Sequence, residues 1–295
     1  MILNDKCGKR IDQALVETLQ ISRSKCQKMI ENNSILVNGE KVRSSYLIKE
    51  NDEIEVLDYL EPDMNVIPEK MDLDIIYEDE DVLIVNKANG IVVHPGSGNY
   101  HHTLVNGLLY HSTSLSNNNG EFRPGIVHRI DAYTTGLLMV AKNNEAHEIL
   151  AKQLEQKTTT RKYIALVWGN INNDTGTIDA PLGRDKKDRK KMAIVEDGNK
   201  AVTHFRVLER LKEATLIELS LETGRTHQIR VHMNYINHPV VNDPVYGKRK
   251  KIDESGQCLH AKTLGFHHPK TGKYMEFTSE LPNEFLNILN QFKDS

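Results

Sequence analysis

The sequence predicts an α+β fold in two parts, a small amino-terminal module and a larger domain built on a largely antiparallel, mixed sheet. Helix-like spacing of apolar residues and a tight hairpin signal occur together within the first 57 residues. Further on, strand-like and helix-like segments mix without the regular β-α-β alternation of a doubly wound fold. We therefore expect a small α+β domain over residues 1–60, a linker over 61–72 and the larger domain over 73–295.

The amino-terminal module is predicted to hold two short helices followed by strands. Apolar residues recur at helical spacing in the first helix: Ile11, Ala14, Leu15 and Leu19. Ser22 is a suitable N-cap for a second helix, which has its own apolar face. Asn38-Gly39 lies between two short apolar segments and predicts a hairpin, and the alternation in residues 53–57 predicts a closing strand.

Charge is unevenly distributed along this module. Acidic residues crowd its end, between residues 50 and 58, whereas the basic residues fall in its helical part: Lys9, Arg10, Arg23, Lys25 and Lys28. This polarity is consistent with one face that meets RNA phosphates, and an ordinary mixed surface is the alternative. A module of this size has a marginal core, so we expect it to dock on a partner.

The larger domain begins after a segment, 58–72, that carries two prolines and several charges and is typical of a linker. VLIVN (82–86) is predicted to be a buried strand. Further strands are predicted over 162–169, 204–209 and 215–221. A helix is predicted over 143–156, with Ala146, Ile149, Leu150 and Leu154 on one face. The stretch 112–120 is predicted to be a flexible polar loop.

Composition indicates a soluble, cytoplasmic protein. The chain is 38% hydrophobic, and no run approaches the roughly 18 apolar residues of a membrane span. Its start, MILNDKCGKR, has no apolar segment typical of a secretory signal. Three cysteines without pair spacing indicate a reducing compartment rather than disulfides or a zinc site.

Net charge and motif searches narrow the function classes. The net charge of −3 does not by itself indicate a nucleic-acid partner, although basic clusters at 184–191 and 248–251 could face phosphates or form solvated loops. No phosphate-cradling loop, dinucleotide fingerprint or nucleophile elbow is present. The histidine pairs at 101–102 and 267–268 do not fit a metal-ligand pattern. We therefore expect neither a metal nor a cofactor.

Two polar segments are candidates for chemistry. In VHRIDAYTTGLLMVAK (127–142), Asp131 precedes a turn signal and an apolar run, so it is either a turn residue or a catalytic carboxylate positioned by a strand. In TGRTHQIRVHM (223–233), Thr226 can cap a helix, which would place Arg230 one turn inside it. Arg230 could then reach a carboxylate and favour its charged form, or form a structural ion pair.

Five segments, taken in order, resemble the motifs of the RluA-type pseudouridine synthase family, in its RluD-like branch. They are NKANGIVVHPGSGN (86–99), VHRIDAYTTGLLMVAK (127–142), RKYIALVWG (161–169), ETGRTHQIRVHMNYINHPVVND (222–243) and LHAKTLGFHHP (259–269). The first 57 residues resemble the small alpha-L RNA-binding domain named after a small-subunit ribosomal protein, through ISRSKCQKMI and VNG. The resemblance covers nearly the whole chain, and the motifs stand in the family's order.

The resemblance implies an isomerase that converts uridine to pseudouridine, with Asp131 as the essential carboxylate. Arg230 would be its ion-pair partner, and Tyr163 would stack on the target base. Arg129 would hold the RNA where that base has been extruded, or else make a phosphate contact or an ion pair. Because a detached base is rejoined through carbon, the reaction needs no redox step, metal or cofactor.

The sequence departs from the family's motifs at three places. Ala88 stands where proline is usual, and Ala132-Tyr133 replaces a commoner basic-acidic pair after Asp131. We expect these changes to affect the rigidity of one turn and RNA contacts more than chemistry. Asn33 replaces a glycine of the small domain, and asparagine tolerates left-handed backbone well.

Large-subunit ribosomal RNA is the substrate that the resemblance favours, and Arg10, Arg23, Lys25 and Lys28 are the expected contacts of the small domain. The same chemistry on transfer RNA is the nearer alternative, and a non-catalytic RNA-binding assembly factor is a weaker one. A glycosidase is disfavoured, because such enzymes use two carboxylates and only Asp131 lies in a matching motif. A monomer that binds RNA and no membrane is the default expectation.

Overall fold

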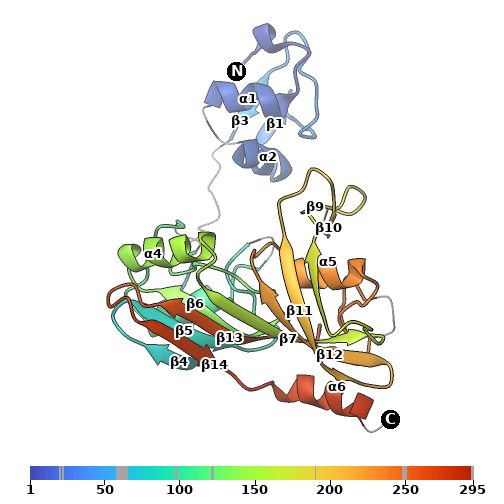
Figure 1. Cartoon of the computed structure of the whole chain (residues 1–295). Coiled ribbons are helices and arrows are strands. Elements are labelled where there is room, and N and C mark those ends of the chain that lie inside the picture. The colour runs from blue at the N-terminus through green and yellow to red at the C-terminus, as the bar shows by residue number, and fades with distance from the viewer. Residues whose placement is uncertain are drawn as a thin grey trace. The chain divides into compact units, whose positions relative to one another are not determined.

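The computed structural model of the chain divides into two compact units, Met1–Met64 and Asn65–Ser295 (Figure 1). The structure describes residues 1–19, 21, 23–57, 66–96, 99–120, 123–189, 191–247 and 251–293, apart from the side chains of Ser24 and Lys25. Each unit combines helices with antiparallel strands, so the predicted α+β class is confirmed. Among the described residues, no helix has both the length and the apolar character needed to cross a membrane.

In its described residues, the small unit contains two α-helices, a short 3₁₀ helix and a three-stranded sheet of order β2-β1-β3. Its elements are η1 (Asn4–Lys6), α1 (Ile11–Leu19), α2 (Arg23–Glu31), β1 (Ile35–Val37), β2 (Glu40–Lys41) and β3 (Ile54–Val56). The predicted hairpin is confirmed, because Asn38 (φ 53°) and Gly39 (φ 74°) form the two-residue turn between β1 and β2. Asn33 adopts φ 60°, the left-handed conformation expected where the family has glycine. Ser22, the predicted N-cap of α2, lies outside the described residues.

The larger unit is built on one extended sheet with the strand order β4-β5-β6-β13-β7-β12-β11-β8, and β14 pairs with β13 (Figure 1). Its strands are β4 (Asp74–Glu78), β5 (Val82–Lys87), β6 (Thr135–Ala141), β7 (Thr160–Trp168), β8 (Thr175–Asp179), β11 (Val202–Arg210), β12 (Ala214–Leu221), β13 (Leu259–His267) and β14 (Tyr274–Thr278). A separate hairpin joins β9 (Leu182–Arg184) and β10 (Met192–Ile194). The predicted strands over 82–86, 162–169, 204–209 and 215–221 fall in β5, β7, β11 and β12.

Four helices pack on this sheet: α3 (Leu104–His111), α4 (Asn144–Glu155), α5 (Gln228–Tyr235) and α6 (Asn283–Lys293). The predicted helix over 143–156 is α4, and its buried Ala146 and Leu150 pack against β5, β6 and β13. α6 places Phe285, Ile288 and Leu289 against β7. The helices therefore cover apolar strand faces that would otherwise be in water, which is the main stabilising contribution to such a fold.

Residues 66–72, the described part of the predicted linker, contact α3. The Glu69 amide donates to the Asn106 carbonyl (2.9 Å), and the Asn106 side chain donates to the Ile67 carbonyl (2.8 Å). Met71 lies against Gly107, where a Cβ atom would approach its Sδ to 3.0 Å. These residues are thus part of the larger unit, whereas residues 58–65 lie outside the described residues.

The polar loop over 112–120 is anchored at Ser116 rather than uniformly exposed. Ser116 is 1% exposed, and its hydroxyl hydrogen-bonds to Nδ1 of His147 on α4 (2.6 Å). Its amide also donates to the Ala141 carbonyl at the end of β6 (3.1 Å). Residues 112–120 thus form the predicted polar loop, and Ser116 holds it in place, because a buried hydroxyl is stable only when it is hydrogen-bonded.

A close crossing of β6 and β13 sets the position of the functional segments. These two strands pair in parallel over two residues only, with Thr135 opposite His260 and Gly136 opposite Ala261. Gly136 has φ 107°, and a Cβ atom there would lie 2.3 Å from the Ala261 carbonyl oxygen. Glycine is therefore required for the approach. The segment that precedes β6, with Asp131 in it, is brought beside the start of β7.

Candidate active site

A cavity of about 720 Å³ opens where the segment before β6, the start of β7, the end of β12 and the start of α5 meet. All four residues that the sequence singled out for chemistry line it: Arg129, Asp131, Tyr163 and Arg230. They come from three segments that are distant in sequence, and the fold brings them together.

Asp131 is on a tight turn at the cavity wall. The Thr134 amide donates to the Asp131 carbonyl (3.0 Å), so the backbone turn expected from the sequence is present. The Asp131 side chain is 17% exposed and faces Arg230. The turn and the catalytic interpretation are compatible, because the turn holds the carboxylate still while leaving it accessible.

Arg230 connects two carboxylates through its guanidinium group. Nη1 donates to Asp131 Oδ2 (2.9 Å), while Nε and Nη2 donate to the two oxygens of Asp243 (2.7 and 2.9 Å). The guanidinium carbon also lies 5.1 Å from the centre of the Tyr246 ring. Burial alone would lower the pKa of Arg230, but Asp243 and Asp131 raise it above its usual value. The arginine is therefore a fixed positive charge that stabilises the negative charge on Asp131.

Asp243 is a site residue that the sequence did not single out. Its side chain is fully buried, and Oδ1 also accepts the amides of Val245 (2.8 Å) and Tyr246 (3.0 Å). Burial by itself would raise the pKa of Asp243, but its bonds with Arg230 outweigh that effect and hold the pKa below its usual value. Asp243 thus orients Arg230 toward Asp131 without reaching the cavity wall.

His227 and Tyr246 complete the group around Asp131. His227 Nε2 lies 3.9 Å from Asp131 Oδ1, and its Nδ1 lies 2.8 Å from the Tyr246 hydroxyl. The Met192 amide on β10 donates to that same hydroxyl (2.9 Å). Burial lowers the pKa of His227, which favours the neutral form of its ring. A neutral histidine beside Asp131 leaves Arg230 as the charge that the carboxylate pairs with.

The entry to α5 differs from the prediction. The N-cap residue is His227, which adopts the left-handed conformation (φ 57°) and makes no side-chain cap bond, so the prediction that Thr226 caps this helix is wrong. Thr226 is exposed, and the Gln228 side chain takes over the local bonds instead. Its Oε1 accepts the Arg225 amide (3.0 Å) and the Thr223 hydroxyl (2.8 Å).

Tyr163 and Arg129 are at different depths of the cavity. Tyr163 on β7 is 7% exposed, and burial raises the pKa of its hydroxyl. Arg129 is exposed at the rim, where its Nη1 lies 3.5 Å from His94 Nε2. One residue offers an aromatic face inside the cavity, and the other offers a positive charge at its mouth.

Lys87 lies beneath the turn that carries Asp131. It is 1% exposed, and its ammonium donates to the carbonyls of Ala88 (2.8 Å) and Ala132 (2.7 Å). Burial lowers the pKa of Lys87 to about 7, although the charge of Asp131 acts in the opposite direction. Two of the positions where the sequence departs from its family, Ala88 and Ala132, thus contribute carbonyls to one buried lysine. The signal in the sequence was a single lysine at the end of an apolar run, VLIVNK.

Two of the basic residues predicted to bind RNA in the small unit, Arg10 and Arg23, form ion pairs with Asp12. Asp12 is fully buried and accepts hydrogen bonds from Arg10 (2.9 and 3.0 Å), Arg23 (3.2 Å) and Gln27 (2.9 Å). Arg10 and Arg23 remain 39% and 54% exposed, and Lys28 is exposed. The side chain of Lys25 lies outside the described residues, as do Lys248, Arg249 and Lys250 of the second basic cluster.

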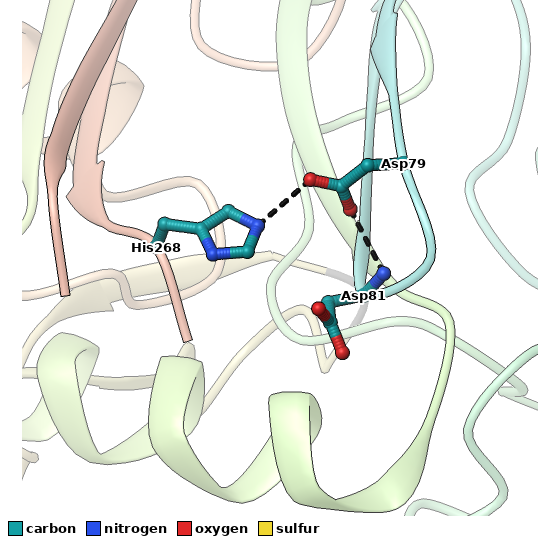
Figure 2. A group of neighbouring side chains, drawn as sticks. All are labelled: Asp79, Asp81 and His268. Atoms are coloured by element: carbon teal, nitrogen blue, oxygen red, sulfur yellow. Dashed lines mark hydrogen bonds and ion pairs between the residues drawn. The ribbon is translucent and has the colours of Figure 1, made fainter. Parts of the chain in front are cut away.

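One further group has the side-chain types of a metal site, Asp79, Asp81 and His268 (Figure 2). Figure 2 shows the His268 ring directed at Asp79, to whose Oδ2 its Nε2 donates (2.8 Å). Nε2 carries the proton because Nδ1 accepts the amides of Lys270 and Thr271 (both 3.2 Å). Asp79 also accepts Tyr77 and two backbone amides, which together outweigh burial and lower its pKa to about 2. These bonds use the atoms that a cation would need, so we assign the group to the packing of the sheet.

Comparison with known proteins agrees with the motifs. The family model described as RNA pseudouridylate synthase matches residues 81–235, and the S4 domain model matches residues 9–54. The chain is 54% identical over 288 residues to "Uncharacterized RNA pseudouridine synthase YlyB" of Bacillus subtilis (strain 168), covering 97% of this chain and 95% of that protein. It is 44% identical over 297 residues to "Ribosomal large subunit pseudouridine synthase D" of Zymomonas mobilis, covering 96% and 93%. The solved structure of human RNA Pseudouridylate Synthase Domain Containing 1 superimposes with a TM-score of 0.59 at 25% identity, covering 76% of this chain and 96% of that one.

Proposed function

Because the chain belongs to the RNA pseudouridylate synthase family and is an isomerase that acts on RNA, we propose that it converts uridines of large-subunit ribosomal RNA to pseudouridine. Relatives named for that substrate match this chain over 85–93% of their own length at 41–44% identity. The match of residues 9–54 to the S4 domain supports an RNA substrate. Transfer RNA is the competing substrate, and no feature of the cavity favours it.

We propose that Asp131 is the essential catalytic group. The observation that supports it is the chain of contacts from Asp243 through Arg230 to Asp131 at the wall of the cavity. A carboxylate held ionised and immobile can act as a nucleophile toward sugar or base, or as the base that drives elimination at the ribose. In each route the bond from C1′ to N1 breaks, the uracil turns, and a bond from C1′ to C5 forms.

The remaining cavity residues have supporting roles in this proposal. The target uridine has to leave its stack to reach Asp131, which costs a few kcal/mol and less in a loop. Tyr163, buried beside Asp131, would stack on the extruded base and exclude water. Arg129, exposed at the rim, would contact the RNA at the position that the base has left.

We also propose that the protein acts as a cytoplasmic monomer. Cys26 and Cys258 are buried free thiols, and such thiols are typical of a reducing compartment. Ribosomal RNA is modified where subunits are assembled, so the proposed substrate supports the same location.

The direct test of the substrate is to map pseudouridines in cells with and without this gene by carbodiimide-stop reverse transcription. We expect stops to disappear at a small set of large-subunit positions in the deletion strain. They should return when the wild-type protein is supplied but not when Asp131→Asn is supplied. Loss of stops in transfer RNA alone would overturn the ribosomal assignment while leaving the chemistry in place.

A further inference from the structure

Arg161, on β7, is a buried arginine for which the described residues provide no side-chain hydrogen-bond acceptor. It is 9% exposed, and its Nε atom is buried without a hydrogen-bond partner. No ion pair joins its guanidinium to a carboxylate within the described part of the chain, whereas Arg230 in the same cavity is bonded to two. A guanidinium group offers five donors and remains charged, so leaving it buried and unpaired is costly.

The side chain of Arg161 lies in the substrate cavity, two residues before Tyr163 and on the same face of β7. Its tip reaches the loop at Gly224, where a Cβ atom would lie 2.8 Å from Nη1. Gly224 is not in the left-handed region, so backbone freedom does not require a glycine here. The glycine matters because it has no side chain to clash with the guanidinium. The loop thus leaves room for the guanidinium at the cavity wall.

Three acids line the cavity, and none of them forms an ion pair with Arg161 within the described ranges: Glu155 is exposed, and the other two are engaged elsewhere. Asp131 is bonded to Arg230, and Glu222 is bonded to Lys157 (2.6 Å) and His204 (2.9 Å). The positive charge of Arg161 nevertheless affects the neighbouring His128. Burial and the charge of Arg161, in that order of size, together lower the pKa of His128 to about 3. A molecule that enters the cavity can therefore supply the acceptor for Arg161.

We propose that Arg161 is a further catalytic residue, which donates to a carbonyl oxygen of the target uracil and stabilises the base while it is detached. This inference rests on the proposed function. When the C1′–N1 bond breaks, its electron pair stays on the base, and the negative charge spreads over N1, O2 and O4. The charge is consumed as C5 bonds to C1′, after which C5 loses its proton and N1 gains one. A fixed cation aimed at a carbonyl oxygen lowers the energy of that charged state more than that of the neutral uridine.

The depth of Arg161 in the cavity favours the uracil base over a backbone phosphate as the acceptor of its hydrogen bond. Phosphates of an extruded nucleotide stay with the RNA backbone, where exposed cations such as Arg129, Lys200 and Arg225 are available at the rim. Arg161 instead lies next to Tyr163, the residue proposed to stack on the uracil. A neutral base with carbonyl oxygens is also less costly to bury than a phosphate.

The test compares Arg161→Met and Arg161→Lys with a control, Lys162→Met, which removes the same charge from the neighbouring residue of β7 and outside the cavity lining. Turnover at saturating RNA, KM and the salt dependence of RNA binding are measured for each. We expect Arg161→Met to lower kcat by about 100-fold to 1,000-fold, the usual loss for one such donor. Binding and its salt dependence should be unchanged, Arg161→Lys should recover part of kcat, and Lys162→Met should resemble the wild type.

A second variant guards against misfolding. Gly224→Ala keeps every charge but displaces the guanidinium, so it should also lower kcat at unchanged RNA affinity. Unchanged kcat in both Arg161→Met and Gly224→Ala would overturn this inference and leave the proposed function in place. Weaker RNA binding by Arg161→Met would also overturn the inference if the slope of log K against log[salt] fell by about 0.7, because that change indicates a lost phosphate contact. A wild-type protein that forms no pseudouridine in any RNA would overturn the proposed function and this inference with it.

Discussion

At the scale of single residues, Asp243 is the group on which the geometry of Asp131 depends. It holds Arg230 by two bonds in a fully buried position, and Arg230 in turn holds Asp131. Breaking a buried ion pair leaves an unpaired charge, which typically costs about 3–5 kcal/mol. We expect Asp243→Asn to lose stability in that range and most activity, as measured by urea unfolding and pseudouridine formation.

The control for this prediction is a surface pair. Glu209 and Lys293 are 3.3 Å apart and 45% and 42% exposed, so Glu209→Gln should cost no more than about 1 kcal/mol. Equal losses in the two variants would contradict the role of Asp243.

The lowered pKa of Lys87 predicts that the free energy of unfolding depends on pH. Burial places its pKa at about 7 in the folded protein, against 10.5 for an exposed lysine. Between these values the unfolded chain binds the extra proton, so the contribution of Lys87 to the free energy of unfolding rises with pH. Relative to Lys87→Met, the wild type should gain up to about 1.4 kcal/mol per pH unit between pH 7.5 and 9 in urea unfolding. Parallel curves for the two proteins would exclude the shift.

The residues of the site differ in how far the sequence could reveal them. Asp131, Tyr163 and Arg230 are in recognisable motifs, and all three line the cavity. Asp243 ends the same quoted segment, 13 residues after Arg230, but only the fold shows that it holds that arginine. Arg161 begins the quoted segment 161–169, but nothing in the sequence singled it out, because an absent hydrogen-bond partner can only be seen in three dimensions.

At the scale of elements, the crossing of β6 and β13 at Gly136 is the most demanding contact near the site. A side chain there would meet the Ala261 backbone at 2.3 Å and adopt an unfavourable φ of 107°. We expect Gly136→Ala to lose more than about 3 kcal/mol, since overpacking adds to backbone strain. Gly120→Ala is the matched control, because it has φ 78° but open space around the Cβ, and should lose only about 1–2 kcal/mol in the same urea titration.

Local sequence signals predicted the turns well where interactions between neighbouring residues determine the backbone conformation. Asn38-Gly39 forms a hairpin because both residues accept positive φ, and Asn33 replaces glycine for the same reason. The cap of α5 was mispredicted, since the left-handed turn at His227 and the bonds of Gln228 outcompete Thr226. The contact between β6 and β13 had no local signal either, because it joins residues more than 120 positions apart.

At the scale of the whole molecule, the small unit is expected to add phosphate contacts to those of the larger one. Lys28 is exposed on α2, and Lys49 is exposed elsewhere in the same unit. We expect Lys28→Gln to weaken RNA binding and to reduce the slope of log K against log[salt] by about 0.7, and Lys49→Gln to leave the slope unchanged. Filter binding at several salt concentrations measures both, and equal slopes in all three proteins would contradict the expectation.

The two-part α+β architecture could be predicted because periodicity and turn chemistry change along the chain. The strand order could not, because β13 inserts between β6 and β7 from far along the sequence. The cavity is a consequence of that order, which brings the start of β6, the start of β7 and the entry to α5 to one place.

The central claim is that Asp131 carries out the chemistry, and Asp131→Asn tests it most directly. The change keeps the shape of the side chain and removes its charge, so the fold and RNA affinity should be nearly unchanged. The measurement is pseudouridine formed in a large-subunit ribosomal RNA transcript, with enzyme in excess over RNA. We predict that the wild type converts its target uridines and that Asp131→Asn forms no detectable product. Measurable conversion by the variant would contradict the claim.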